Sequence, residues 1–201
     1  MKRKEIIVNN QKDLNRFYKS LWLYKSFIYK NTEFYSNSKY DITSIINGLN
    51  IKNRRKRIDY IHDEACNEID LSLPNSNPCE FIDGRCIVQR SNPNNHYCYG
   101  CCRFCIHCTD KGCPSKNLSC KFFNCSAVKE RDKIKKYKDL NILKLLSWRG
   151  RIIVKHDYFC LREEILHDLY IDELFIVSIR IIYRIIRNEI KRRVRKIDRR
   201  V

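Results

Sequence analysis

Apolar residues recur at helical spacing through the first seventy positions and divide that part of the chain into three predicted helices. The first covers residues 11–30, and its apolar stripe consists of Leu14, Phe17, Leu21, Tyr24 and Ile28. The second is short, is capped by Asp41 and ends near Gly48. The third extends from about Arg54 to Leu71, and residues 72–78, rich in Ser, Asn and Pro, are predicted to form a linker.

Helical spacing resumes after residue 125. Residues 126–147 are predicted to form a helix, and Gly150 predicts a turn followed by a short strand or extended segment to Val154. One long helix or a pair of helices is expected from Tyr158 to Arg199. Its C-terminal half carries an apolar stripe of Ile179, Ile182, Tyr183, Ile186, Ile190, Val194 and Ile197. We expect this stripe to face the core or a partner helix, with contact to an anionic membrane surface as the alternative for so basic a helix.

Residues 79–125 differ in kind from the helical parts. They hold ten of the twelve cysteines and few aliphatic residues, and Asp83-Gly84 and Lys111-Gly112 are typical of turns. The chain is therefore predicted to be mostly α. An N-terminal helical region (1–78) and a basic C-terminal helical region (126–201) would flank a compact, irregular, cysteine-rich metal knuckle with short hairpins (79–125).

The cysteine spacing favours thiolate ligation of a metal. Within Cys98-Tyr-Gly-Cys-Cys-Arg-Phe-Cys-Ile-His-Cys108, several Cys-x2-Cys steps overlap. A two-residue gap lets a tight turn present two sulfurs to one ion at about 2.3 Å. The candidate metal ligands are Cys79, Cys86, Cys98, Cys101, Cys102, Cys105, Cys108, Cys113, Cys120 and Cys125. His96 and His107 are possible substitutes for a thiolate.

Zinc is the favoured metal because a closed thiolate site suits it in any geometry that the protein offers. An iron–sulfur cluster is the alternative, since Cys102-x2-Cys105-x2-Cys108-x4-Cys113-Pro114 comes within one residue of the bacterial ferredoxin spacing. Disulfides or free thiols are the third possibility. The longest apolar run near the N-terminus, Ile6–Val8, is far shorter than the roughly 7–15 residues of a signal-peptide core. We therefore expect a cytoplasmic location, where clustered cysteines more often bind metals than form disulfides.

Part of this segment resembles the cysteine-cluster proteins of the CxxCxxCC group, which are ascribed a zinc- or iron-chelating domain. The resemblance lies in Tyr99-Gly-Cys-Cys-Arg103, Lys111-Gly-Cys-Pro114 and Leu118-Ser-Cys-Lys-Phe-Phe-Asn-Cys125. It covers about 47 of the 201 residues; the first step, Cys98-x2-Cys101-Cys102, is shorter than in the group, and Cys108 is additional. The resemblance implies metal ligation by Cys98, Cys101, Cys102, Cys105, Cys113, Cys120 and Cys125, and it implies no particular activity.

Charge points to an anionic partner. The chain carries a formal net charge of +18, and Arg180 to Arg200 alone contains ten basic and two acidic residues. Such a segment attracts nucleic acid, an acidic protein or an anionic lipid surface. We expect a structural or interaction role for the metal-binding protein. The alternatives are a nucleic-acid-binding module that uses the basic C-terminal helix and, least supported, a redox or metalloenzyme, because no phosphate loop, G-x-S-x-G or H-E-x-x-H is present.

Several isolated residues are assigned ordinary structural roles. Cys66 and Cys160 are expected to be small core residues. His62 is expected on a helix surface, and His156 and His167 lie in no motif. Because Arg180 and Arg184 interrupt the longest apolar stretch, no segment reaches the roughly 20 apolar residues of a membrane span.

Overall fold

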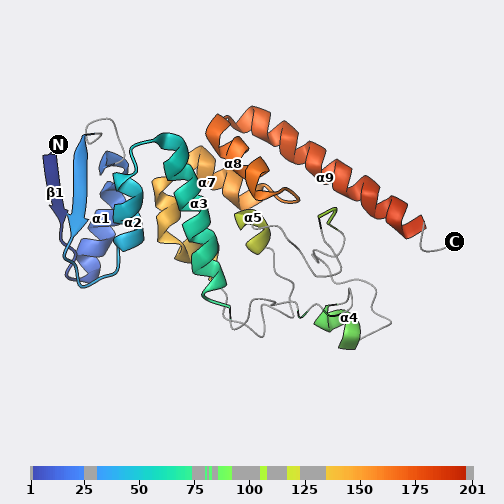
Figure 1. The fold of residues 1–201 in the computed structure, drawn as a ribbon, viewed down its shortest axis with the longest axis horizontal. Coiled ribbons are helices and arrows are strands. Elements are labelled where there is room, and N and C mark those ends of the chain that lie inside the picture. The colour runs from blue at the N-terminus through green and yellow to red at the C-terminus, as the bar shows by residue number, and fades with distance from the viewer. Residues whose placement is uncertain are drawn as a thin grey trace.

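The computed structural model describes residues 2–24, 31–73, 80, 82, 86–91, 105–107, 117–122 and 135–197. These parts are mostly helical, as predicted. A small sheet lies at one end of the molecule, a group of helices occupies the middle, and the longest helix extends away at the other end (Figure 1). No helix in the described part of the chain is both long and apolar enough to cross a membrane.

The N-terminal part contains a parallel strand pair that the sequence did not predict. Strand β1 (Lys2–Ile6) pairs with β2 (Thr32–Ser36), with Lys2 opposite Thr32. Helix α1 (Gln11–Tyr24) lies between them in the chain and accounts for the described part of the predicted helix 11–30. The Asn50 side chain accepts from the backbone N–H of Phe34 at 2.8 Å and donates to its carbonyl at 2.7 Å. This amide therefore satisfies backbone groups of β2 that the two-stranded sheet leaves unpaired.

The second and third helices confirm the predicted periodicity. Helix α2 (Thr43–Asn50) has Ile42 as its N-cap residue, not Asp41 as predicted. The Asp41 carboxylate still accepts from the backbone N–H of Thr43 at 3.1 Å. The helix continues two residues beyond Gly48, where the sequence predicted its end. Helix α3 (Arg54–Asp70) buries the predicted face of Ile58, Ile61, Ala65 and Ile69.

Residues 137–145 form two short 3-10 turns, η3 (Tyr137–Asp139) and η4 (Asn141–Leu145), where the sequence predicted a helix within 126–147. The buried side chains of this stretch are Leu140, Ile142, Leu143, Leu145 and Leu146. An α-helix would spread them over about 220° of its circumference, whereas three residues per turn align them in two rows. The tighter turns thus let η4 pack against α1, α2 and α3.

The prediction of a turn and strand at 148–154 was wrong, because helix α7 (Trp148–His156) occupies this stretch. Ser147 is its N-cap, and the Ser147 hydroxyl oxygen accepts from the backbone N–H of Gly150 at 2.8 Å. Gly150 is buried inside the helix rather than at a turn. A Cβ at Gly150 would lie 3.2 Å from Ser147 Oγ, so a larger residue here would crowd the hydroxyl that caps the helix.

Where the sequence predicted one long helix or a pair, the structure has a pair: α8 (Arg162–Ile171) and α9 (Leu174–Ile197). Asp172 separates them in a left-handed conformation, with φ 53°. Of the two faces expected for the apolar stripe of α9, the core or a partner helix, the core is wrong. Its described members from Ile179 to Val194 are exposed, and α9 instead buries Val177, Arg184 and Asn188.

Candidate functional site

The structure describes three of the ten cysteines that the sequence nominated as metal ligands, namely Cys86, Cys105 and Cys120. The other seven, Cys79, Cys98, Cys101, Cys102, Cys108, Cys113 and Cys125, lie outside the described residues, as does His96. No disulfide joins two cysteines of the described ranges. Within those same ranges, no three Cys, His, Asp or Glu side chains converge as a metal site would require.

Cys120 belongs to a short helix that is embedded in the helical core. Helix α5 (Leu118–Lys121) contacts both α3 and α7, and Leu118 is fully buried. Asn117 caps the helix by accepting from the backbone N–H of Ser119 at 2.8 Å. The Lys121 ammonium pairs with Asp70 at the end of α3. The position of Cys120 is therefore fixed by its neighbours on both sides.

Two polar side chains connect this helix to the turn after α7. The Asn117 amide donates to the carbonyl oxygen of Asp157 at 3.0 Å and to that of Cys160 at 3.2 Å. The Ser119 hydroxyl donates to the carbonyl oxygen of Val154 at 2.6 Å. Asn117 and Ser119 are fully buried, so these bonds satisfy groups that would otherwise be costly to bury.

Cys160 lies near Cys120 at this junction and is fully buried, as the sequence predicted. Burial raises the pKa of the Cys160 thiol, and the negative charges of Asp157 and Cys120 raise it further. Cys66 on α3 is also buried, and its pKa is raised to about 12, chiefly by burial. Neither thiol has the low pKa that a catalytic nucleophile needs.

His62 is fully buried, which corrects its predicted place on the helix surface. Its Nε2 accepts from the backbone N–H of Leu118 at 3.3 Å, while its Nδ1 lies 3.1 Å from Asp63 Oδ1. A neutral ring that accepts at Nε2 carries its proton on Nδ1. Nδ1 therefore has no lone pair with which to deprotonate Cys66, whose sulfur lies 4.0 Å away. The Cys-His-Asp grouping connects α3 to α5 and is not a catalytic triad.

Residues 105–107 also belong to the cysteine-rich segment, and they lie against α9. Cys105 is buried, and the backbone N–H of Ile106 donates to the Asn188 side chain at 2.9 Å. Burial lowers the pKa of His107, opposed by Glu164 and by the backbone of Phe159. His107 Nε2 is buried and has no hydrogen-bond partner among the described residues. The neutral form of the His107 ring is thus favoured, and the lone pair of Nε2 could bind a metal ion.

A network of buried, oppositely charged side chains lies beside this junction, and the sequence pattern did not predict it. Arg184 Nη1 contacts Asp168 Oδ2 at 2.7 Å and also contacts Asp157 Oδ1. Arg180 Nε lies 2.5 Å from the other oxygen of Asp168. Both aspartates are fully buried, so α7, α8 and α9 are joined through charges shielded from water. The only sequence signal was that Arg180 and Arg184 interrupt an apolar stretch.

This network shifts the pKa values of its members. Burial raises the pKa of Asp157 to about 7, and the nearby Asp168 carboxylate adds to this effect, while Arg184 opposes it. The pKa of Arg184 is raised above its usual range because the aspartate charges outweigh the effect of its burial. The arginines therefore stay charged, and the network is suited to holding helices together rather than to transferring protons.

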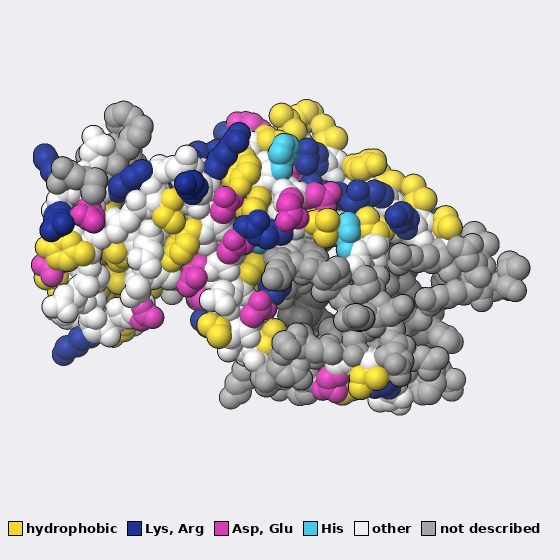
Figure 2. All heavy atoms as spheres, in the orientation of Figure 1, with side chains coloured by type: hydrophobic (Ala, Val, Ile, Leu, Met, Phe, Trp, Pro, Cys, Tyr) yellow, Lys and Arg dark blue, Asp and Glu magenta, His cyan; other side chains and the backbone are white. Residues whose placement is uncertain are grey.

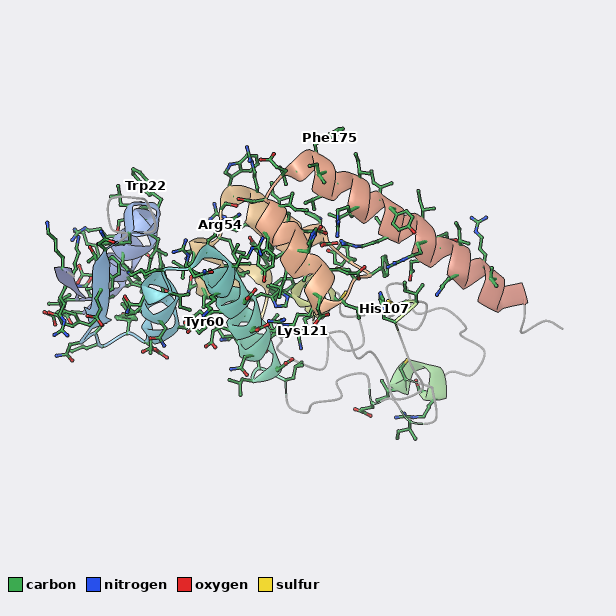
Figure 3. The ribbon with its side chains drawn as sticks, turned by 45° about the horizontal axis from the view of Figure 1, so that its top comes forward. Trp22, Arg54, Tyr60, His107, Lys121 and Phe175 are labelled. Atoms are coloured by element: carbon green, nitrogen blue, oxygen red, sulfur yellow. The ribbon has the colours of Figure 1, made fainter. Side chains whose placement is uncertain are left out.

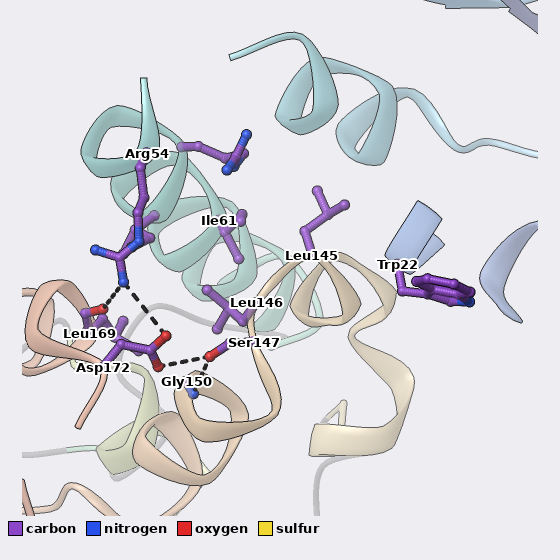
Figure 4. A pocket seen from close by; sticks show the side chains of 11 residues that line it. Trp22, Arg54, Ile61, Leu145, Leu146, Ser147, Gly150, Leu169 and Asp172 are labelled. Atoms are coloured by element: carbon purple, nitrogen blue, oxygen red, sulfur yellow. Dashed lines mark hydrogen bonds and ion pairs between the residues drawn. The ribbon is translucent and has the colours of Figure 1, made fainter. Parts of the chain in front are cut away.

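A pocket of about 290 Å³ lies between α3, η4, α7 and the end of α8 (Figure 4). The Arg54 guanidinium donates to the Leu169 carbonyl at 3.4 Å and lies 3.6 Å from the Asp172 carboxylate. The Ser147 hydroxyl donates to Asp172 at 2.7 Å. These polar groups of the pocket wall bind one another and so join the start of α3 to the residues around α7 and the end of α8.

Comparisons with protein-family models, with curated proteins and with solved structures find no match to this chain.

Proposed function

We propose that this chain is a metal-binding cysteine-cluster protein. The thiolates between Cys79 and Cys125 would hold zinc, or alternatively an iron–sulfur cluster, and the metal would order this segment against the helical core. The observation that carries the proposal is the sequence itself, with ten cysteines and overlapping Cys-x2-Cys steps within 47 residues. A metal would supply the folding free energy that a segment with few aliphatic residues cannot obtain from a core of its own.

The described parts of the segment support the proposal in two ways. Cys105 is buried beside α9, and Cys120 lies in a helix capped within the core, so two candidate sulfurs are held by a preformed scaffold. The buried Nε2 of His107 offers a further donor, and metal-bound histidines are normally neutral. The cluster would act as a structural or interaction site, because its neighbouring buried groups serve packing.

The proposal is tested by metal analysis of protein purified without oxygen. The intact chain is expected to carry zinc or iron in stoichiometric amount. Cys105→Ser and Cys120→Ser should each lower the metal content, because each removes a proposed ligand. Cys66→Ser is the matched control, since Cys66 is buried as Cys105 is but lies on α3 outside the cluster, and this variant should keep its metal.

Equal metal content in all four proteins would contradict the assignment of Cys105 and Cys120 as ligands. A metal-free native protein would overturn the proposed function as a whole. Thiol titration of the folded, metal-loaded protein separates this role from that of a redox enzyme. Ligated cysteines should resist the reagent, whereas a catalytic dithiol should react with it.

A further inference from the structure

Helix α9 presents a row of bulky apolar side chains to solvent. This outer row consists of Phe175, Ile179, Ile182, Tyr183, Ile186, Ile190 and Val194, which are 50% to 79% exposed. Phe175 projects outward where α9 begins (Figure 3), and apolar side chains follow the outer edge of the helix (Figure 2). A soluble monomer rarely exposes so continuous an apolar surface unless that surface binds something.

The orientation of α9 is fixed by the opposite side of the helix. Arg184 is buried against Asp157 and Asp168, and Asn188 accepts from the backbone N–H of Ile106. At about 100° per residue, Ile186 points roughly 160–200° away from both Arg184 and Asn188. The helix cannot rotate its apolar row inward without leaving two buried aspartates unpaired, which would cost several kcal/mol. Exposure of the outer row is therefore built into the fold.

The charge of α9 indicates an anionic partner. From Leu174 to Ile197 the helix contains eight basic residues and one acidic residue, Glu189, which pairs with Arg193 at 3.1 Å. Arg187 and Lys191 lie four residues apart along one border of the outer row, and Arg180 falls on the same border. Of these, Arg180 is bound to Asp168 and Arg187 lies 3.8 Å from Glu164, so Lys191 is the cation of this border for which no ion pair is described. An apolar row bordered by Arg and Lys is the pattern of helices that lie in a membrane interface.

We propose that α9 docks through its outer row on the surface of an anionic lipid bilayer. From Phe175 to Val194 the row is about 28 Å long and lies on a convex helix, so a flat lipid surface can receive all of it without a matching groove. A second copy of the chain is disfavoured, because pairing two outer rows would bring two sets of basic side chains together. The apolar side chains would enter the acyl boundary while the basic side chains of α9 contact the headgroups.

The test is cosedimentation of the full chain with lipid vesicles. Binding is expected to vesicles of phosphatidylcholine mixed with phosphatidylserine, to be much weaker with phosphatidylcholine alone, and to fall as salt is raised. The Ile182→Ser/Ile186→Ser variant should bind at least about tenfold more weakly, because two inserting side chains are lost. The matched control is Leu71→Ser/Ile152→Ser, which removes two exposed apolar side chains from α3's end and α7 and should bind as the wild type does.

Three outcomes would overturn the proposal. The first is absence of binding to anionic vesicles at low salt. The second is equal weakening by the outer-row and control variants, which would mean that charge alone drives adsorption. The third is a wild-type protein that is dimeric without lipid while the outer-row variant is monomeric, since the outer row would then be covered by a second copy. Circular dichroism of both double variants checks that α9 remains folded.

Discussion

Arg184 on α9 donates to the Asp168 carboxylate on α8 at 2.7 Å, and both side chains are buried. The same guanidinium nitrogen contacts Asp157 after α7, so one cation joins three helices. This arrangement determines which face of α9 packs inward and therefore which face is exposed. It also fixes the turn at residues 157–160, to which the cysteine-bearing helix α5 is bonded through Asn117.

Removing the cation should be strongly destabilising. Arg184→Met is expected to lower the free energy of unfolding by about 3–5 kcal/mol, because Asp157 and Asp168 would be left buried without their main partner. Urea denaturation followed by circular dichroism measures this loss. Arg193→Met is the control, since it removes an exposed ion pair within α9 and should change stability by about 0.5 kcal/mol or less.

A compensating variant separates charge from packing. Adding Asp157→Asn and Asp168→Asn to Arg184→Met should restore part of the lost stability, because both buried carboxylates are then neutral. The recovery is only partial, since Arg180 loses its partner Asp168. If the triple variant is no more stable than Arg184→Met, the loss comes from packing, and the electrostatic explanation is wrong.

Stability should depend on pH through Asp157. Its pKa is raised to about 7 in the folded protein, above the value of about 3.9 in an unfolded chain. Its contribution to stability is therefore fully present below about pH 4 and is lost as the pH rises towards 7. The Asp157→Asn variant has no carboxyl group to titrate at this position, so it does not lose this stability. The difference in the free energy of unfolding, variant minus wild type, should therefore become more positive between about pH 5 and pH 8. A difference that is constant over this range would show that the carboxyl group does not titrate as described.

The N-cap of α7 should contribute measurably to stability. In Ser147→Ala, the backbone N–H of Gly150 loses its acceptor and Asp172 loses a hydrogen-bond donor. We expect a loss of about 1–2 kcal/mol in the free energy of unfolding. Ser44→Ala is a suitable control, because Ser44 lies in the first turn of α2 but is not the cap residue of that helix. Equal small effects of the two substitutions would argue against the capping role.

The buried thiols should be unreactive in the folded protein. Burial raises the pKa of Cys66 to about 12 and that of Cys160 beyond its usual range, so little thiolate exists near neutral pH. Alkylation with iodoacetamide followed by peptide mass mapping should modify both residues in urea but neither in the native state. Rapid native labelling of Cys66 or Cys160 would mean that α3 or the 157–160 turn opens readily.

Helical periodicity was sufficient to predict α1, α3 and the helical nature of α9, because each has an apolar stripe over two or more turns. It left open whether one helix or two would cover residues 158–199. The strands β1 and β2 gave no such signal, since each has five residues and β1 is mostly charged. The α7 cap was missed because the glycine at 150 resembles a turn residue, although Ser147 three positions earlier marks the start of a helix.

The inward face of α9 could not be predicted from the pattern alone. Apolar residues normally face the core, and here the reverse holds because Arg184 has buried partners that lie 16 and 27 positions away in the chain. The same limit applies to the junction with α5. Asn117 can be buried only because it meets backbone carbonyls 40 and 43 positions away, and no local spacing reveals that contact. The candidate ligands Cys105 and Cys120, by contrast, were found from spacing within their own segment.

Metal K-edge X-ray absorption on the full chain, isolated without oxygen, tests directly whether the clustered thiolates bind a metal. We expect zinc or iron with a first shell dominated by sulfur at about 2.3 Å. A protein that is natively folded, holds no metal and carries its clustered cysteines as disulfides would contradict this expectation.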